Sequence, residues 1–100
     1  MVIKRASNCP LCGAKMTALE LLDACTEFID PHLGILEAHC PYCQGYLEVM
    51  PSAGQVDIGY RVADVRFDSA LSLPCDGLVV ERTAGSMALK TQERSWAFPG

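Results

Sequence analysis

Six cysteines carry most of the chemical information in this chain, and four of them form two closely spaced pairs. The pairs are Cys9-Pro10-Leu11-Cys12 near the start and Cys40-Pro41-Tyr42-Cys43 near the middle. Each pair places two thiols three positions apart on a tight turn, so four sulfurs can converge on one ion at about 2.3 Å from it. The spacing predicts a metal site, favours zinc, and names its ligands as Cys9, Cys12, Cys40 and Cys43.

The two Cys-x2-Cys motifs resemble those of the zinc-ribbon family, and the resemblance covers about residues 8–60 only. Gly13 follows the first motif, as a turn of this kind favours, whereas Gln44 takes the same position after the second motif. The resemblance implies one structural Zn²⁺ per chain and no reaction. Four thiolates fill a tetrahedral site and leave no position for water or substrate, so we expect no enzyme here.

Other uses of these cysteines stay open. The spacing is also close to that of rubredoxin, whose four cysteines hold one iron for electron transfer, although a helix between the motifs does not match rubredoxin's loop-rich interior. A thioredoxin-like redox motif opens a helix after a strand, and neither motif has that context. Three disulfides are disfavoured in a reducing compartment. Iron electron transfer and thiol redox chemistry are therefore secondary alternatives.

The remaining cysteines and histidines have simpler structural interpretations. Cys25 lies on the apolar side of an expected helix, where a buried thiol behaves as a small hydrophobic residue. Cys75 lies on an expected loop without a neighbouring base to activate it. His39 precedes a ligand and is an alternative to it, but four thiolates already suffice, and His32 is expected on a loop.

Acidic and aromatic residues supply the other candidates for function. The carboxylates Asp57, Asp64 and Asp68 have no acid–base context and are expected on solvated faces or in turns. Tyr42, within the second motif, and Trp96, near the end, are the best recognition candidates, because exposed aromatic side chains make good interface anchors.

Charge narrows the class of partner. The net charge of the 100 residues is −4, with three basic and six acidic residues in 1–50 and five basic and six acidic residues in 51–100. Lys4-Arg5 is the only adjacent basic pair. Because nucleic-acid affinity comes largely from clustered Lys and Arg, a nucleic-acid-binding zinc ribbon is an alternative that the charge disfavours. A 50% apolar composition favours a compact chain that binds a protein partner or self-associates.

The sequence contains no signal for a membrane. Residues 1–8 lack the apolar region of a signal peptide, and no stretch approaches the roughly 18 apolar residues of a membrane helix. We therefore expect a cytoplasmic protein without a membrane partner, whose thiols stay reduced.

A helix is expected between the two cysteine pairs. Thr17 and Glu20 form a capping-box pattern, in which each side chain bonds a backbone N–H group of the other residue. Apolar residues then recur at three- and four-residue spacing as far as Ile29, and Pro31 disfavours a longer helix. The pattern predicts a helix over about residues 18–29.

Strands are expected on both sides of the second cysteine pair and beyond it. Residues 35–39 and 46–50 predict an antiparallel hairpin with the metal turn at its tip, and alternation predicts a strand over 56–62 followed by a bulge or turn. The proline-broken residues 71–75 are expected as a loop or a very short strand. Residues 78–83 and 87–92 predict a second hairpin. The tail with Trp96 either folds back onto the sheet or contacts a partner.

These elements predict one α+β domain over residues 1–100, with a possible seam at 51–54. Residues 1–50 are its metal-binding, zinc-ribbon-like half, and residues 51–100 are a β-rich half that extends the same antiparallel sheet. The acidic balance and the missing catalytic set favour a protein-interaction or accessory module.

Overall fold

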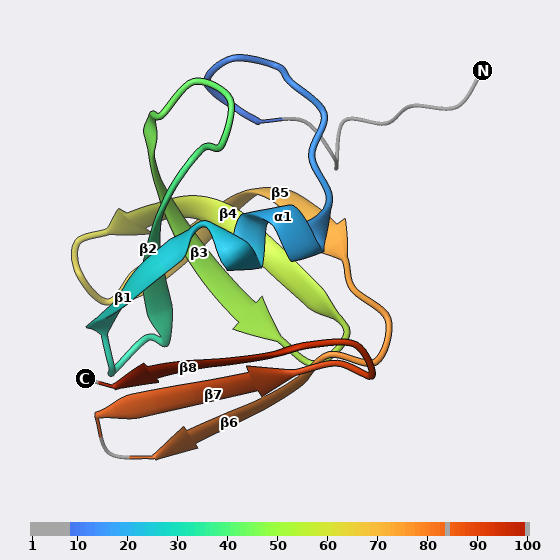
Figure 1. Ribbon diagram of the computed structural model, residues 1–100. Coiled ribbons are helices and arrows are strands. Elements are labelled where there is room, and N and C mark those ends of the chain that lie inside the picture. The colour runs from blue at the N-terminus through green and yellow to red at the C-terminus, as the bar shows by residue number, and fades with distance from the viewer. Residues whose placement is uncertain (1–8, 84, 100) are drawn as a thin grey trace.

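The computed structural model describes residues 9–83 and 85–99 (Figure 1). These residues form one short helix and two antiparallel sheets, so the chain is a small, β-rich α+β protein. The elements are α1 (Ala18–Asp23), β1 (Cys25–Asp30), β2 (Ile35–His39), β3 (Tyr46–Ser52), β4 (Gln55–Val62), β5 (Arg66–Pro74), β6 (Val79–Thr83), β7 (Ser86–Lys90) and β8 (Ser95–Pro99). The basic pair Lys4-Arg5 lies outside the described residues.

The larger sheet has five strands in the order β1-β2-β3-β4-β5. The hairpin predicted around the second cysteine pair is confirmed, with Leu36 of β2 opposite Val49 of β3. The strand predicted over 56–62 is confirmed as β4. Residues 63–65 turn the chain from β4 into β5, and Ala63 and Asp64 in this turn have φ angles of 55° and 58°. Left-handed residues are common in tight hairpin turns.

The prediction of a helix over residues 18–29 is correct at its start and wrong at its end. The capping box is present, because Glu20 N–H donates to Thr17 Oγ1 at 3.1 Å and Thr17 N–H donates to Glu20 Oε1 at 2.9 Å. After Asp23 the chain turns into β1 instead of continuing as helix. The helix therefore has six residues.

Irregular pairing in β1 explains the error. Cys25 and Phe28 are both buried, although residues three apart point to opposite faces of a regular strand. The register between β1 and β2 shifts between Cys25 and Glu27 and again between Phe28 and Asp30. Such bulges turn residues at helical spacing onto one face, so the apolar pattern fits both structures.

The second half of the chain departs from the prediction in two places. Residues 71–75, expected as a loop or a very short strand, mostly belong to the nine-residue β5, with Pro74 at its end on the edge of the sheet, where proline is tolerated. Strands β6, β7 and β8 form a separate three-stranded sheet and do not extend the first one. The predicted second hairpin is confirmed as β6–β7, apart from Ala84, which lies outside the described residues.

One hydrophobic cluster joins the two sheets and the helix. It contains Leu21 and Leu22 from α1, Leu36, Val49 and Ile58 from the larger sheet, and Met87, Leu89 and Phe98 from the smaller one. The tail folds back as β8, and Trp96 Nε1 donates to Asp23 Oδ1 at 2.9 Å. The predicted division at residue 50 falls inside β3, and the assignment of domains stays a prediction. No helix of the described residues is long and apolar enough to cross a membrane.

Candidate metal centre

The four predicted ligands lie together, and the two loops that carry them are at one end of the molecule (Figure 1). Their sulfur atoms are all within 4.8 Å of one another, and Cys12 Sγ lies 3.8 Å from Cys40 Sγ. Four sulfurs at about 2.3 Å from a central ion are separated by roughly 3.8 Å in a tetrahedron. The cluster is therefore compact enough to hold one metal ion. Cys9 and Cys40 are buried, whereas Cys12 and Cys43 reach the surface.

Two loops with the same backbone hydrogen bonds carry the four cysteines. We call residues 9–14, before α1, the first knuckle, and residues 40–45, between β2 and β3, the second knuckle. In each knuckle the carbonyl of the first cysteine accepts from the N–H group four residues later, and its N–H group donates to the carbonyl five residues later, all at 2.9 Å. The two halves of the site are therefore built alike, although their sequences differ.

The equivalent position of the two knuckles is left-handed in both. Gly13 has φ 76°, and Gln44, which departs from the glycine that this turn favours, still adopts φ 65°. A left-handed residue with a side chain is disfavoured by roughly 1–2 kcal/mol. The second knuckle therefore stores backbone strain that the first does not.

Gln44→Gly is expected to stabilise the metal-loaded protein. Relief of the left-handed strain exceeds the greater freedom of glycine in the unfolded chain, so the free energy of unfolding rises by about 0.5–1 kcal/mol. Thermal unfolding at saturating metal concentration measures the change. Gly13→Ala is the matched control, and it should lower stability by a similar amount. A Gln44→Gly variant that melts at or below the parent temperature contradicts this account of the turn.

Backbone N–H groups point at the sulfurs and favour their ionised form. Leu11 N–H lies 3.3 Å from Cys9 Sγ, and Tyr42 N–H lies 3.4 Å from Cys40 Sγ. Burial opposes ionisation of the Cys40 thiol, but the N–H groups of Cys43 and Tyr42 outweigh it and lower the pKa of Cys40 to about 7. At Cys9 burial dominates and raises the pKa. Cys40 therefore ionises near neutral pH, as a metal ligand must.

The second knuckle is tied to the start of the helix. Tyr42, which is exposed, donates its O–H group to Glu20 Oε2 at 2.8 Å. The other carboxylate oxygen of Glu20 accepts the N–H group of Thr17 in the capping box. These two bonds hold the pKa of Glu20 below its usual value, with the Thr17 bond the larger cause. One carboxylate thus joins the helix cap to the cysteine cluster.

The two histidines lie outside the cluster of metal ligands. His39 has its Nε2 4.0 Å from Glu37 Oε2 and packs its ring edge-to-face with Tyr46, at 6.0 Å between ring centroids. His32 is an exposed residue of the β1–β2 turn, where its N–H group donates to Asp30 Oδ1 at 3.0 Å. The structure therefore gives both residues local packing or turn roles.

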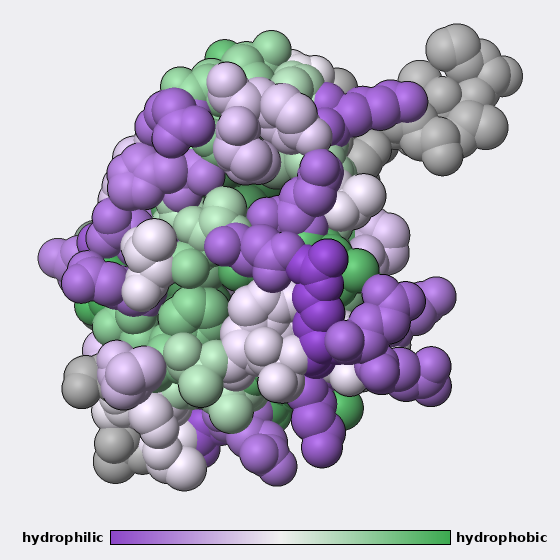
Figure 2. All heavy atoms as spheres, in the orientation of Figure 1, coloured by the Kyte–Doolittle hydropathy of each residue, from purple (hydrophilic) through white to green (hydrophobic). Residues whose placement is uncertain are grey.

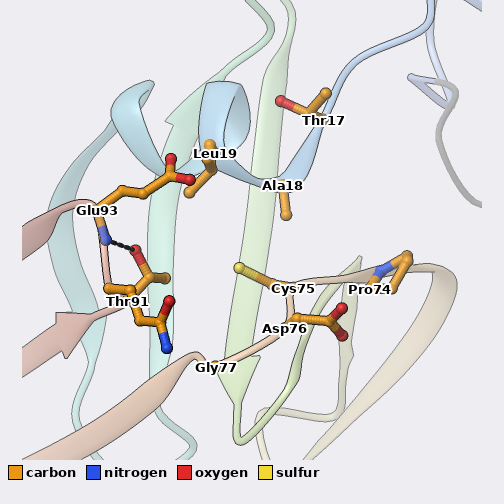
Figure 3. Close-up of a pocket in the computed structure, with 10 residues that line it drawn as sticks. Thr17, Ala18, Leu19, Pro74, Cys75, Asp76, Gly77, Thr91 and Glu93 are labelled. Atoms are coloured by element: carbon orange, nitrogen blue, oxygen red, sulfur yellow. Dashed lines mark hydrogen bonds between the residues drawn. The ribbon is translucent and has the colours of Figure 1, made fainter.

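The two further cysteines are buried and electrostatically unsuited to nucleophilic chemistry. Burial raises the pKa of Cys25 to about 12, and its thiol donates to the carbonyl of Leu21 at 3.4 Å. Burial and then the charge of Asp76 raise the pKa of Cys75. Figure 3 shows the Cys75 sulfur directed across a pocket of 450 Å³ toward the first turn of α1. The raised pKa values disfavour the ionised form of both thiols, as is typical of buried structural cysteines.

The acidic residues singled out in the sequence do not form an acid–base pair. Asp57 accepts from Gln55 on its own strand and from Ser72 across the β4–β5 ladder, and Asp68 lies 3.4 Å from Arg66. Asp64 is in the β4–β5 turn. Asp57 therefore helps β4 pair with β5, Asp68 takes part in a surface ion pair, and Asp64 is a turn residue.

One surface feature was missed by the sequence reasoning. Tyr60 continues the alternation of Val56 and Ile58, which predicts a side chain on the buried face, yet it is 58% exposed. Leu11, at the tip of the first knuckle, is 59% exposed. Both line one groove of 510 Å³. The only signal in the sequence is the turn that follows Val62, because a strand near its end extends beyond the core.

Comparisons of the chain with models of protein families, with curated proteins and with solved structures find no match.

Proposed function

We propose that the protein is a zinc-binding interaction or accessory module, with one structural Zn²⁺ per chain held by the four clustered cysteines. The observation that carries the proposal is the approach of their sulfurs to within 4.8 Å of one another, from two loops far apart in sequence. When bound, zinc would cross-link the two knuckles, and its four thiolate ligands would leave no open coordination position. Its role is then to hold the fold together.

The donor set supports zinc ahead of iron. Four thiolates at tetrahedral spacing suit zinc, and they also suit the single iron of an electron carrier. Rubredoxin has an aromatic interior, whereas Tyr42, the aromatic residue inside the second knuckle, is exposed and hydrogen-bonded to Glu20. The resemblance to zinc ribbons adds to this support, and iron is the competing outcome of the test below.

The charge distribution supports a protein partner and not a nucleic acid. Lys4 and Arg5 aside, the chain has six basic residues, and three of them are already paired with carboxylates: Arg61, Arg66 and Arg94. A tetrathiolate zinc site adds about two negative charges to a net charge of −4. Binding of this chain to the phosphates of a nucleic acid is therefore electrostatically unfavourable.

Native mass spectrometry is the direct test, because it reports metal identity, stoichiometry and subunit number together. We expect a mass increment of one Zn²⁺ per chain, and a Co²⁺-substituted sample with the absorption of a tetrahedral thiolate site. The Cys43→Ala variant should lose both signals, whereas Cys75→Ala, outside the cluster, should keep them. An iron-loaded red protein, or metal-free protein that remains fully folded, contradicts the proposal.

A further inference from the structure

A groove lies between the first knuckle and the β4–β5 end of the larger sheet. Its volume of 510 Å³ is in the range of sites that hold a peptide side chain or a small ligand. Its floor is buried and its walls are exposed apolar side chains, and the lining residues that matter are Pro10, Leu11, Leu47, Ile58, Tyr60 and Asp64. In the view of Figure 2, apolar surface lies both at the end that carries the knuckles and across the middle of the molecule.

Both walls are fixed in place by the fold. Leu11 packs against the second knuckle so closely that a Cβ atom at Gly45 would lie 2.3 Å from Leu11 Cδ1. Tyr60 stands on β4 opposite Asp68 of β5, in the paired segment that follows the register shift between Ile58 and Gly59. The groove is thus preformed, and a ligand would not have to order its walls.

The charged residues that line the groove carry a net negative charge. Glu48, Arg61 and Asp64 are its charged lining residues. Arg61 is committed elsewhere, because its Nε and Nη2 atoms donate to the two oxygens of Glu48 at 3.1 and 3.0 Å, and its Nη1 lies 3.5 Å from Asp30 Oδ2. Asp64 forms no salt bridge among the described residues, although its charge acts on Arg61 more weakly than the charges of Glu48 and Asp30 do. It lines the same groove as the exposed ring of Tyr60.

A groove lined by an aromatic ring and by a carboxylate without a salt bridge is complementary to a cation with an apolar stem. The ring attracts a cation to its face, and the aliphatic part of Lys or Arg can lie along the apolar floor. The proposed zinc site, on the same side as Leu11, would add about two negative charges. A second copy of this chain fits less well, because its net charge of −4 repels an acidic groove.

We propose that this groove binds an extended cationic segment of a partner protein, with a Lys or Arg side chain lying over Tyr60 and its charge at Asp64. The proposal rests on the proposed interaction role, for which it names the surface and the chemistry of the partner. In this proposal the metal site holds the loop that carries Leu11, one wall of the groove, in place.

Fluorescence anisotropy with a short labelled peptide of alternating lysine and leucine tests the proposal on the metal-loaded full chain. We expect saturable binding that weakens as salt is raised, and no binding of the matched glutamate and leucine peptide. Asp64→Asn should weaken binding by about fivefold, and Tyr60→Leu, which keeps an apolar wall but removes the ring, by about threefold. Glu81→Gln, which makes the same charge change on β6, should bind within about twofold of the parent.

Several outcomes would overturn the proposal. They are absence of binding by the lysine peptide, equal binding of the two peptides, and equal losses in Asp64→Asn and Glu81→Gln. A concentration-dependent dimer that Tyr60→Leu abolishes would assign the groove to a second copy. The Co²⁺ absorption of each variant is recorded alongside. If the parent chain gives the Co²⁺ absorption but does not bind the lysine peptide, the groove proposal is wrong and the metal site stands. If the parent chain gives no Co²⁺ absorption, the proposed metal site is wrong.

Discussion

Removal of the metal is expected to unfold the protein. A structural zinc contributes about 10–16 kcal/mol of binding free energy, which is comparable to or larger than the roughly 5–15 kcal/mol by which a typical domain is stable. In this chain the four sulfurs connect the loop before α1 to the β2–β3 hairpin, and two of them, Cys9 and Cys40, are buried. Without the ion, these two loops would lose the link between them.

Circular dichroism before and after chelation measures this loss, and Cys40→Ser provides a genetic version of it. Both should show loss of the β-sheet signal together with exposure of Trp96, which is held against Asp23 in the folded chain. Cys75→Ser is the control, since Cys75 is buried but lies outside the cluster. An unchanged spectrum after the metal has demonstrably left would contradict a structural role.

The second large effect is expected from Gly59→Ala. Gly59 lies where the register between β4 and β5 shifts, and a Cβ atom there would be 2.0 Å from the backbone oxygen of Asp68 and 3.0 Å from Phe67 Cε2. A backbone atom cannot move aside as a flexible side chain can, so the two strands must separate. Overpacking of this kind costs typically 1–3 kcal/mol, and we expect about 3 kcal/mol of lost stability here.

Gly77→Ala separates this steric effect from the general effect of replacing glycine. Gly77 has φ 79°, but a Cβ atom there would meet nothing within 4 Å. We expect it to cost only the left-handed penalty of about 1–2 kcal/mol. Chemical denaturation of both metal-loaded variants measures the difference. Equal stability losses in the two variants would show that contact between β4 and β5 is not the reason for glycine at position 59.

The local signals in the sequence predicted the elements that begin with a specific chemical pattern. The capping residues Thr17 and Glu20 correctly placed the start of α1, and the alternation through Ile58 correctly placed β4. The end of α1 was wrong because Cys25 and Phe28 have the spacing of one helix face, and two bulges in β1 give the same spacing on one face of a strand. The residues alone do not distinguish these two cases.

Long-range features could not be read from neighbouring residues. The approach of the four cysteines was predicted because metal chemistry demands it, independent of the path of the chain between them. Nothing comparable specifies that β6–β8 form their own sheet, since a hairpin with alternating residues can pair at either edge or pack face to face. The left-handed conformation of Gln44 runs against the preference of its own side chain, and only its place in the motif, equivalent to that of Gly13, indicated it.

The double use of Glu20 has a consequence for the order of folding events. A helix of six residues is far too short to persist alone, so α1 must form late, after its surroundings exist. Its cap carboxylate is shared with Tyr42 of the second knuckle, which also carries two of the four clustered cysteines. We therefore expect α1 to become stable only after the second knuckle has formed, and contacts made by Thr17 to slow unfolding more than they speed folding.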